Sequence, residues 1–132
     1  MEVCSSYQSL ALFARGEGEW EALDARVRRA QLVSMAKLLD ELYPTLRWFL
    51  FDLRRSYSVP LTIFGPQRIA IYVGDMWLVS TSQEHIRLLT GHFDNLIRAA
   101  VMQPPEVIDY VRRLVDEVDL GDRRARAAPA PD

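Results

Sequence analysis

The apolar positions along the chain repeat, over four stretches, with the period of a helix. From about Leu23 to Tyr43 they recur every three or four residues, which is the spacing of one helix face. The same spacing returns at residues 81–101 and 105–121, and a shorter stretch at residues 5–14 shows it near the N-terminus. The pattern therefore predicts two N-terminal and two C-terminal helices, the last ending at Gly121.

Between the two pairs of helices, the apolar residues come in short runs rich in aromatic and β-branched side chains, which favour strands. The predicted strands cover residues 47–53, 60–65, 69–73 and 76–80. Gly74-Asp75 separates the last two. Glycine in the first position of a two-residue loop suits a type II′ hairpin turn, because that position needs a positive φ.

Short connections join these strands, so the predicted sheet is an antiparallel meander. The expected fold is α+β, an antiparallel four-stranded β-meander flanked by two N-terminal and two C-terminal helices. A length of 132 residues fits one domain, which we place at residues 5–120. Residues 121–132, "GDRRARAAPAPD", lack periodicity and are expected to be a disordered tail.

The last two predicted strands carry apolar side chains on both faces. Met76 and Leu78 face one side and Trp77 and Val79 the other, whereas a sheet with one wet face alternates apolar with polar residues. Either the chain's own helices cover both faces, or one face or an open edge pairs with a second copy or frames a pocket. The sequence leaves these alternatives open.

Charge and composition are those of an ordinary globular chain. The formal net charge is −2, with arginines and carboxylates interspersed, so we expect no strong attraction to nucleic acid or to anionic lipid. Cys4 is the only cysteine, which excludes an intrachain disulfide and a cysteine-based zinc site. No apolar run approaches the ~20 residues of a membrane span, and the N-terminus lacks the basic region of a secretion signal. A cytoplasmic location is expected.

No motif in the chain indicates catalysis or a cofactor. There is no G-x-S-x-G elbow, P-loop or dinucleotide-binding glycine pattern. His85 and His92 stand seven residues apart, which is about 10 Å along a helix and too far for the pair to hold one metal ion. Asp52 suits an acid or a base, but no spacing pairs it with another carboxylate. We therefore expect neither an enzyme nor a metal site.

Aromatic and polar side chains gather around the predicted sheet and the helix that follows it. Aromatic residues in such places commonly line small-molecule pockets, although more of them belong to cores. The candidate ligand or dimer surface consists of Trp48, Arg68, Tyr72, Trp77 and His85.

Several segments, among them "FARGEG", "RWFLFD", "FGPQR" and "HFDNLIRAA", occur in an order that is similar to a known group of proteins. From about Ser6 to Val118 the chain resembles the C-terminal regulatory region of proteobacterial helix-turn-helix transcriptional regulators. The resemblance implies an effector-sensing and dimerisation domain that forms a homodimer and binds a small-molecule effector. It also implies that DNA is contacted only through a separate N-terminal domain.

A second function class stays open beside this one. The chain could be a stand-alone protein-protein interaction or adaptor domain that uses the same apolar surface without a small ligand.

Overall fold

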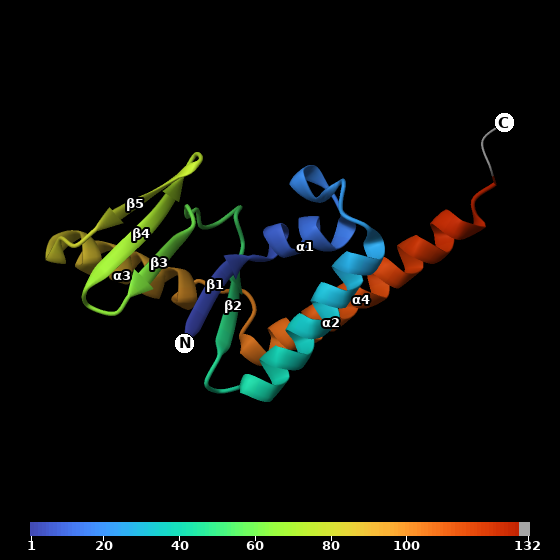
Figure 1. Ribbon diagram of the computed structural model, residues 1–132. Coiled ribbons are helices and arrows are strands. Elements are labelled where there is room, and N and C mark those ends of the chain that lie inside the picture. Colours follow the sequence, from blue (N-terminus) through green and yellow to red (C-terminus); the bar gives the residue numbers. More distant parts are fainter. Residues whose placement is uncertain (130–132) are drawn as a thin grey trace.

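The main body of the protein is a pair of antiparallel helices, shown by the computed structural model, which describes residues 1–129 (Figure 1). These helices are α2 (Ala25–Leu42) and α4 (Pro104–Ala127). Their apolar stripes face each other in the core, where Leu32, Val111 and Leu114 are fully buried. The helical period in these two segments therefore marks the faces that pack together.

Two strands beside the helical pair form a parallel sheet. β1 (Glu2–Ser6) pairs with β2 (Arg47–Phe51), with Val3 opposite Trp48. The expected antiparallel four-stranded meander is therefore wrong, because the first strand after the helices pairs with an N-terminal strand instead of its sequence neighbour. Residues 2–6 had no strand prediction, since the stretch is short and contains two serines.

The crossover between these parallel strands holds the N-terminal helices. It consists of α1 (Tyr7–Arg15), the short 3₁₀ helix η1 (Gly18–Trp20) and α2. A parallel pair requires such a long connection, because the chain must return to the same end of the sheet. The helices expected before the sheet are thus confirmed, but they connect two strands instead of preceding all of them.

The other three strands form a separate antiparallel sheet in the order β3 (Leu61–Phe64), β4 (Arg68–Val73) and β5 (Met76–Ser80). Val73 pairs with Met76 across the two-residue loop, and Gly74 has a φ of +59°. The predicted hairpin is confirmed. This part of the expected meander exists with three strands instead of four.

The helix α3 (Gln83–Arg98) joins the two sheets from behind (Figure 1). It contacts β1 and β2 as well as β4, and it buries Ile86 and Leu96. It does not cover β5, whose residues Met76 to Val79 remain 52–62% exposed. The chain's own helices therefore leave both faces of β5 open.

The last helix is longer than its sequence pattern predicts. α4 passes through Gly121 and continues to Ala127, so Gly121 as its end is wrong. Glycine inside a helix costs only about 1 kcal/mol, and an ion pair one turn apart, Asp122 with Arg126 at 3.0 Å, supports this end. Of the expected disordered tail, residues 130–132 lie outside the described residues. Neither α4 nor any other helix within residues 1–129 is long and apolar enough to cross a membrane.

Candidate ligand-binding cleft

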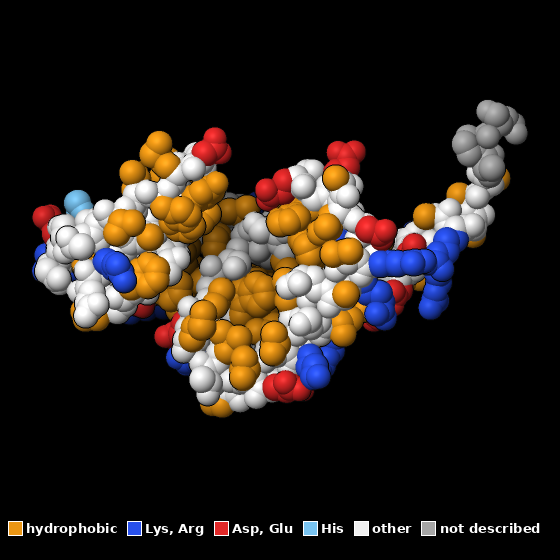
Figure 2. All heavy atoms as spheres, viewed as in Figure 1, with side chains coloured by type: hydrophobic (Ala, Val, Ile, Leu, Met, Phe, Trp, Pro, Cys, Tyr) orange, Lys and Arg blue, Asp and Glu red, His pale blue; other side chains and the backbone are white. Residues whose placement is uncertain are grey.

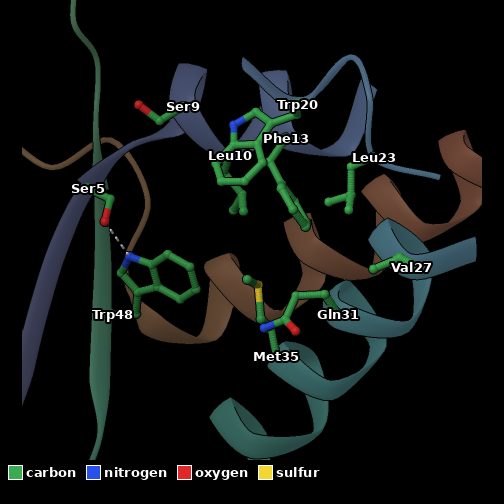
Figure 3. A pocket seen from close by; sticks show the side chains of 10 residues that line it. All are labelled: Ser5, Ser9, Leu10, Phe13, Trp20, Leu23, Val27, Gln31, Met35 and Trp48. Atoms are coloured by element: carbon green, nitrogen blue, oxygen red, sulfur yellow. Dashed lines mark hydrogen bonds between the residues drawn. The ribbon is translucent and has the colours of Figure 1, made fainter. Parts of the chain in front are cut away.

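An apolar cleft opens where the N-terminal helices meet the parallel sheet (Figure 3). Its volume is about 440 Å³, which lies within the range of small-molecule sites. Residues of β1, α1, η1, α2 and β2, together with one loop residue, form its walls. They are Ser5, Ser9, Leu10, Phe13, Trp20, Leu23, Val27, Gln31, Met35 and Trp48.

One wall of this cleft is an aromatic pair. The rings of Phe13 and Trp20 meet edge to face, with centroids 5.1 Å apart. The pair forms because α1 ends at Gly16, whose left-handed φ of 65° turns the chain back. That turn lets η1 place Trp20 against the helix it has just left. Trp20 was not among the residues predicted from the sequence. A tryptophan at the end of an acidic, glycine-rich turn was the available signal.

The opposite wall comes from the parallel sheet. Trp48 projects from β2, and its indole Nε1 donates a hydrogen bond to Ser5 Oγ of β1 at 3.1 Å (Figure 3). This bond fixes the ring with its apolar face toward the cleft. Trp48 is the one predicted site residue that lines this cleft.

The polar groups of the cleft are few and uncharged. They are the hydroxyls of Ser5 and Ser9 and the amide of Gln31. The Ser9 hydroxyl is also hydrogen-bonded to Ser6 Oγ at 2.6 Å. Apolar and aromatic walls with a few polar groups bind and orient small molecules. Because no charged side chain lines the cleft, its chemistry favours an uncharged, largely apolar ligand.

A second hollow of about 560 Å³ lies between the two sheets, next to the cleft. Figure 2 shows apolar side chains around the hollowed middle of this face of the molecule. Trp77 borders the second hollow, Phe93 and Leu96 of α3 also line it, and Ser5 and Ser9 line both hollows. The cleft and the second hollow are therefore neighbours.

The remaining predicted site residues lie at two ends of the antiparallel sheet. Tyr72 and Trp77 face each other across β4 and β5, with ring centroids 5.1 Å apart. The Arg68 guanidinium lies 5.3 Å from the centre of the Phe64 ring, at the start of β4. His85 Nδ1 is 2.9 Å from Ser80 Oγ, at the end of β5.

The structure thus brings together only two of the five predicted residues, Tyr72 and Trp77. Arg68 and His85 belong to the opposite end of the hairpin from this aromatic pair, and Trp48 belongs to the other sheet. The five residues do not surround one common site.

Asp52 is held in a hydrogen-bond network at the end of β2. Its carboxylate accepts bonds from the Arg54 side chain and backbone and from Gln8 Nε2, the last at 2.6 Å. Gln8 Oε1 in turn accepts from the Leu53 backbone N–H at 3.1 Å. The Arg54 hydrogen bonds hold the pKa of the Asp52 carboxyl well below its usual range. A carboxylate so stabilised is a poor proton donor or base at neutral pH, and its contacts instead join α1 to β2.

Burial disfavours the thiolate form of the single cysteine. Cys4 lies within β1, and burial raises the pKa of its thiol to about 11. Within residues 1–129, no group of three or more His, Cys, Asp or Glu side chains is placed to hold a metal ion.

Comparison of the chain with protein-family models, with curated proteins and with solved structures found no match. What the cleft binds therefore has to be inferred from its own shape and chemistry.

Proposed function

We propose that this chain is an effector-sensing and dimerisation domain of a bacterial transcription regulator, with DNA contacted through a separate domain. The effector is a small, uncharged and largely apolar molecule that occupies the cleft between α1, η1, α2 and β2. The observation that carries this proposal is the cleft itself, with two tryptophans and a phenylalanine around a volume of about 440 Å³.

The position of the cleft suits a regulatory role. Phe13 belongs to α1, Trp20 to η1, Met35 to α2 and Trp48 to β2, so a bound molecule contacts segments that are far apart in sequence. A ligand shifts a conformational equilibrium only through its different affinity for the two states. A molecule that bridges α2 and the parallel sheet favours the arrangement in which these elements are close.

The regulatory context comes from the resemblance of "FARGEG", "RWFLFD", "FGPQR" and "HFDNLIRAA" to the C-terminal region of helix-turn-helix regulators. A cytoplasmic location belongs to the same proposal, because a domain that controls a DNA-binding segment acts where the DNA is.

Two measurements test the cleft. Native mass spectrometry of the chain purified from cells is expected to show extra mass that is lost on denaturation. Calorimetric titration with 1-naphthol, an uncharged bicyclic compound with one hydroxyl, is expected to show one saturable site.

A matched pair of variants locates that site. Val27 lines the cleft on α2 and is 53% exposed, whereas Val33, on the same helix, is 42% exposed and lies outside it. Val27→Arg is expected to weaken naphthol binding at least tenfold, or about 1.4 kcal/mol, because it brings a charge to an apolar opening. Val33→Arg is expected to leave binding unchanged. Equal effects of the two variants, or absence of both retained mass and naphthol binding, would contradict the proposal.

The alternative function is a protein-protein interaction domain without a small ligand. The observation that favours it is the exposed apolar strand β5, where Trp77 is 54% and Val79 is 62% exposed. Naphthol binding separates the two functions. A sensing domain binds naphthol in the cleft and loses it with Val27→Arg, whereas an interaction domain without a small ligand does not bind it.

A further inference from the structure

The strand β5 lacks the features by which proteins protect a sheet edge. It is the last strand of the antiparallel sheet. Natural edge strands carry charges, prolines or bulges, or are covered, because their unpaired backbone groups otherwise recruit another strand. Residues Met76 to Ser80 include neither a charged residue nor a proline, and the register from Val73–Met76 to Ile69–Ser80 runs without a bulge.

The hairpin register fixes which backbone groups of β5 are free. Val73 and Met76 close a two-residue loop, so they form a hydrogen-bonded pair, and hydrogen-bonded pairs alternate along an antiparallel ladder. The Tyr72 N–H donates to Pro60 O, in the segment before β3, at 2.9 Å, so it points away from β5. Tyr72 and Trp77 are therefore a non-hydrogen-bonded pair of the β4–β5 ladder. The N–H and C=O groups of Trp77 and Val79 therefore point away from β4, toward the open edge.

We propose that two copies of the chain associate through β5, antiparallel and centred on Leu78, to form a continuous six-stranded sheet. In this register Trp77 of one protomer stands opposite Val79 of its partner. Each of the two Trp77–Val79 pairs exchanges two backbone N–H···O=C hydrogen bonds, which gives four hydrogen bonds in all. Each Trp77–Val79 pair places an aromatic side chain beside a β-branched one, a favourable cross-strand combination. Shifting the centre to Trp77 would place Asp75 of the turn in the ladder.

Symmetry and charge favour a second copy as the occupant. A two-fold interface brings each residue of a surface against its counterpart, so any charge at its centre would meet a like charge. Residues Met76 to Ser80 include no charged side chain that would meet its own counterpart across such an interface. Its four apolar side chains are about half exposed, and pairing along the edge covers only the side of each that faces the partner strand. A single pair of five-residue strands buries less than the ~1,200–2,000 Å² of a stable interface, so the dimer is expected to be weak.

This inference rests on the dimerisation part of the proposed function and is independent of the cleft. A chain that binds naphthol but does not dimerise would overturn this inference and leave the cleft proposal standing. A chain that dimerises but does not bind naphthol would overturn the cleft proposal and leave this inference standing.

A cysteine cross-link tests the register. In the proposed pairing, the two Leu78 residues form a non-hydrogen-bonded pair with Cα atoms about 4.5 Å apart, within the reach of a disulfide. In a Cys4→Ala background, Leu78→Cys is expected to give a disulfide-linked dimer on mild oxidation with copper phenanthroline. The matched control is Leu120→Cys on α4, since Leu120 is 51% and Leu78 52% exposed. Equal cross-linking of the two variants would overturn the proposal.

Sedimentation velocity tests the association of the unmodified chain. At roughly 100 µM, above the dissociation constant expected of a weak interface, we expect a substantial dimer fraction. Leu78→Lys, which opposes two like charges at the centre, should lower this fraction at least tenfold. Leu88→Lys, at a 64% exposed site on α3, should not change it, and far-ultraviolet circular dichroism should show both variants folded. A monomeric wild-type chain, or a dimer that tolerates Leu78→Lys, would overturn the proposal.

Discussion

At the scale of single residues, Gly16 occupies a position where a side chain would meet both backbone strain and a close contact. Its φ of 65° is in the left-handed region, and a Cβ atom there would lie 2.7 Å from Arg28 Cζ. The Arg28 guanidinium has little freedom to move, because it donates to Ala14 O and to Leu23 O. This glycine therefore allows both the turn that positions Trp20 and the arginine that secures the end of α1.

We predict that Gly16→Ala destabilises the protein by about 2–3 kcal/mol, since it adds backbone strain and displaces the arginine. Gly18→Ala is the control, because Gly18 also has a positive φ, of 62°, but no atom within 4 Å of a Cβ. It should cost only the backbone term, about 1 kcal/mol. Urea unfolding measures both, and an equal loss in the two variants would contradict the role of Arg28.

A second residue-scale prediction concerns Asp52. Its folded-state pKa is lowered, first by the Arg54 hydrogen bonds, so the ionised carboxylate stabilises the fold. This contribution is fully present above the unfolded-state pKa of about 4 and is lost as the pH falls through the lower, folded-state pKa. Asp52→Asn should therefore lower the melting temperature at pH 7, and the gap to wild type should begin to narrow as the pH falls below about 4.

Thermal unfolding followed at several pH values measures this gap. Asp75→Asn, at the exposed hairpin turn, serves as the control for removal of a surface carboxylate and should change the melting temperature little. A gap that stays constant from neutral to acid pH would show that the Asp52 network stabilises the fold through shape and not through charge.

At the scale of elements, the length of α4 predicts the sign of the stability change that Gly121→Ala produces. Gly121 lies inside this helix, with no atom within 4 Å of a Cβ and no positive φ. Gly121→Ala should therefore stabilise the protein by up to about 1 kcal/mol. Had the helix ended at Gly121 in a left-handed conformation, alanine would destabilise it. Chemical unfolding and the helical circular dichroism signal, compared with wild type, separate the two cases.

Elements defined by local chemistry were predictable, and those defined by distant partners were not. The hairpin followed from Gly74-Asp75 between two apolar runs, and α2 from its apolar spacing. The strand β1 has neither signal. It exists because residues 2–6 hydrogen-bond to β2, and that pairing then leaves β3 to begin a separate sheet.

At the scale of the whole molecule, the apolar core is unevenly distributed. The main cluster of buried residues comes from α1, α2, α4 and β2 and includes no residue of β3, β4, β5 or α3. The antiparallel sheet instead buries Ile69 and Ala70, and α3 buries Ile86 and Leu96. Segments with few buried apolar contacts open at a lower free energy than the core.

Hydrogen exchange should therefore be faster in the antiparallel sheet than in the helical core. In a dilute, monomeric solution, amides of β4 and β5 should exchange faster than those around Leu32 and Leu114, which are fully buried. Exchange followed by mass spectrometry on peptides from each region measures the difference. Uniform protection would mean that the sheet and the helical core unfold as one unit.

The candidate site divides in the same way. Trp48 was found from the sequence because aromatic residues on a strand are conspicuous, while Phe13 and Trp20 were not. Phe13 and Trp20 come together only through the turn at Gly16. The opposite wall depends on a hydrogen bond between Ser5 and Trp48, which are 43 residues apart. A cavity is a property of several elements at once, and no periodicity along one of them reports it.

By itself, the sequence determined the positions of the long helices, the hairpin and the apolar character of β5, because helix period, turn geometry and side-chain polarity are local properties. Only the tertiary structure decided that β1 pairs with β2, that the sheet is split, and that an aromatic cleft opens beside α1. It also decided that α3 leaves β5 uncovered. These features depend on free energies of contact between residues far apart in the chain, which local patterns do not encode.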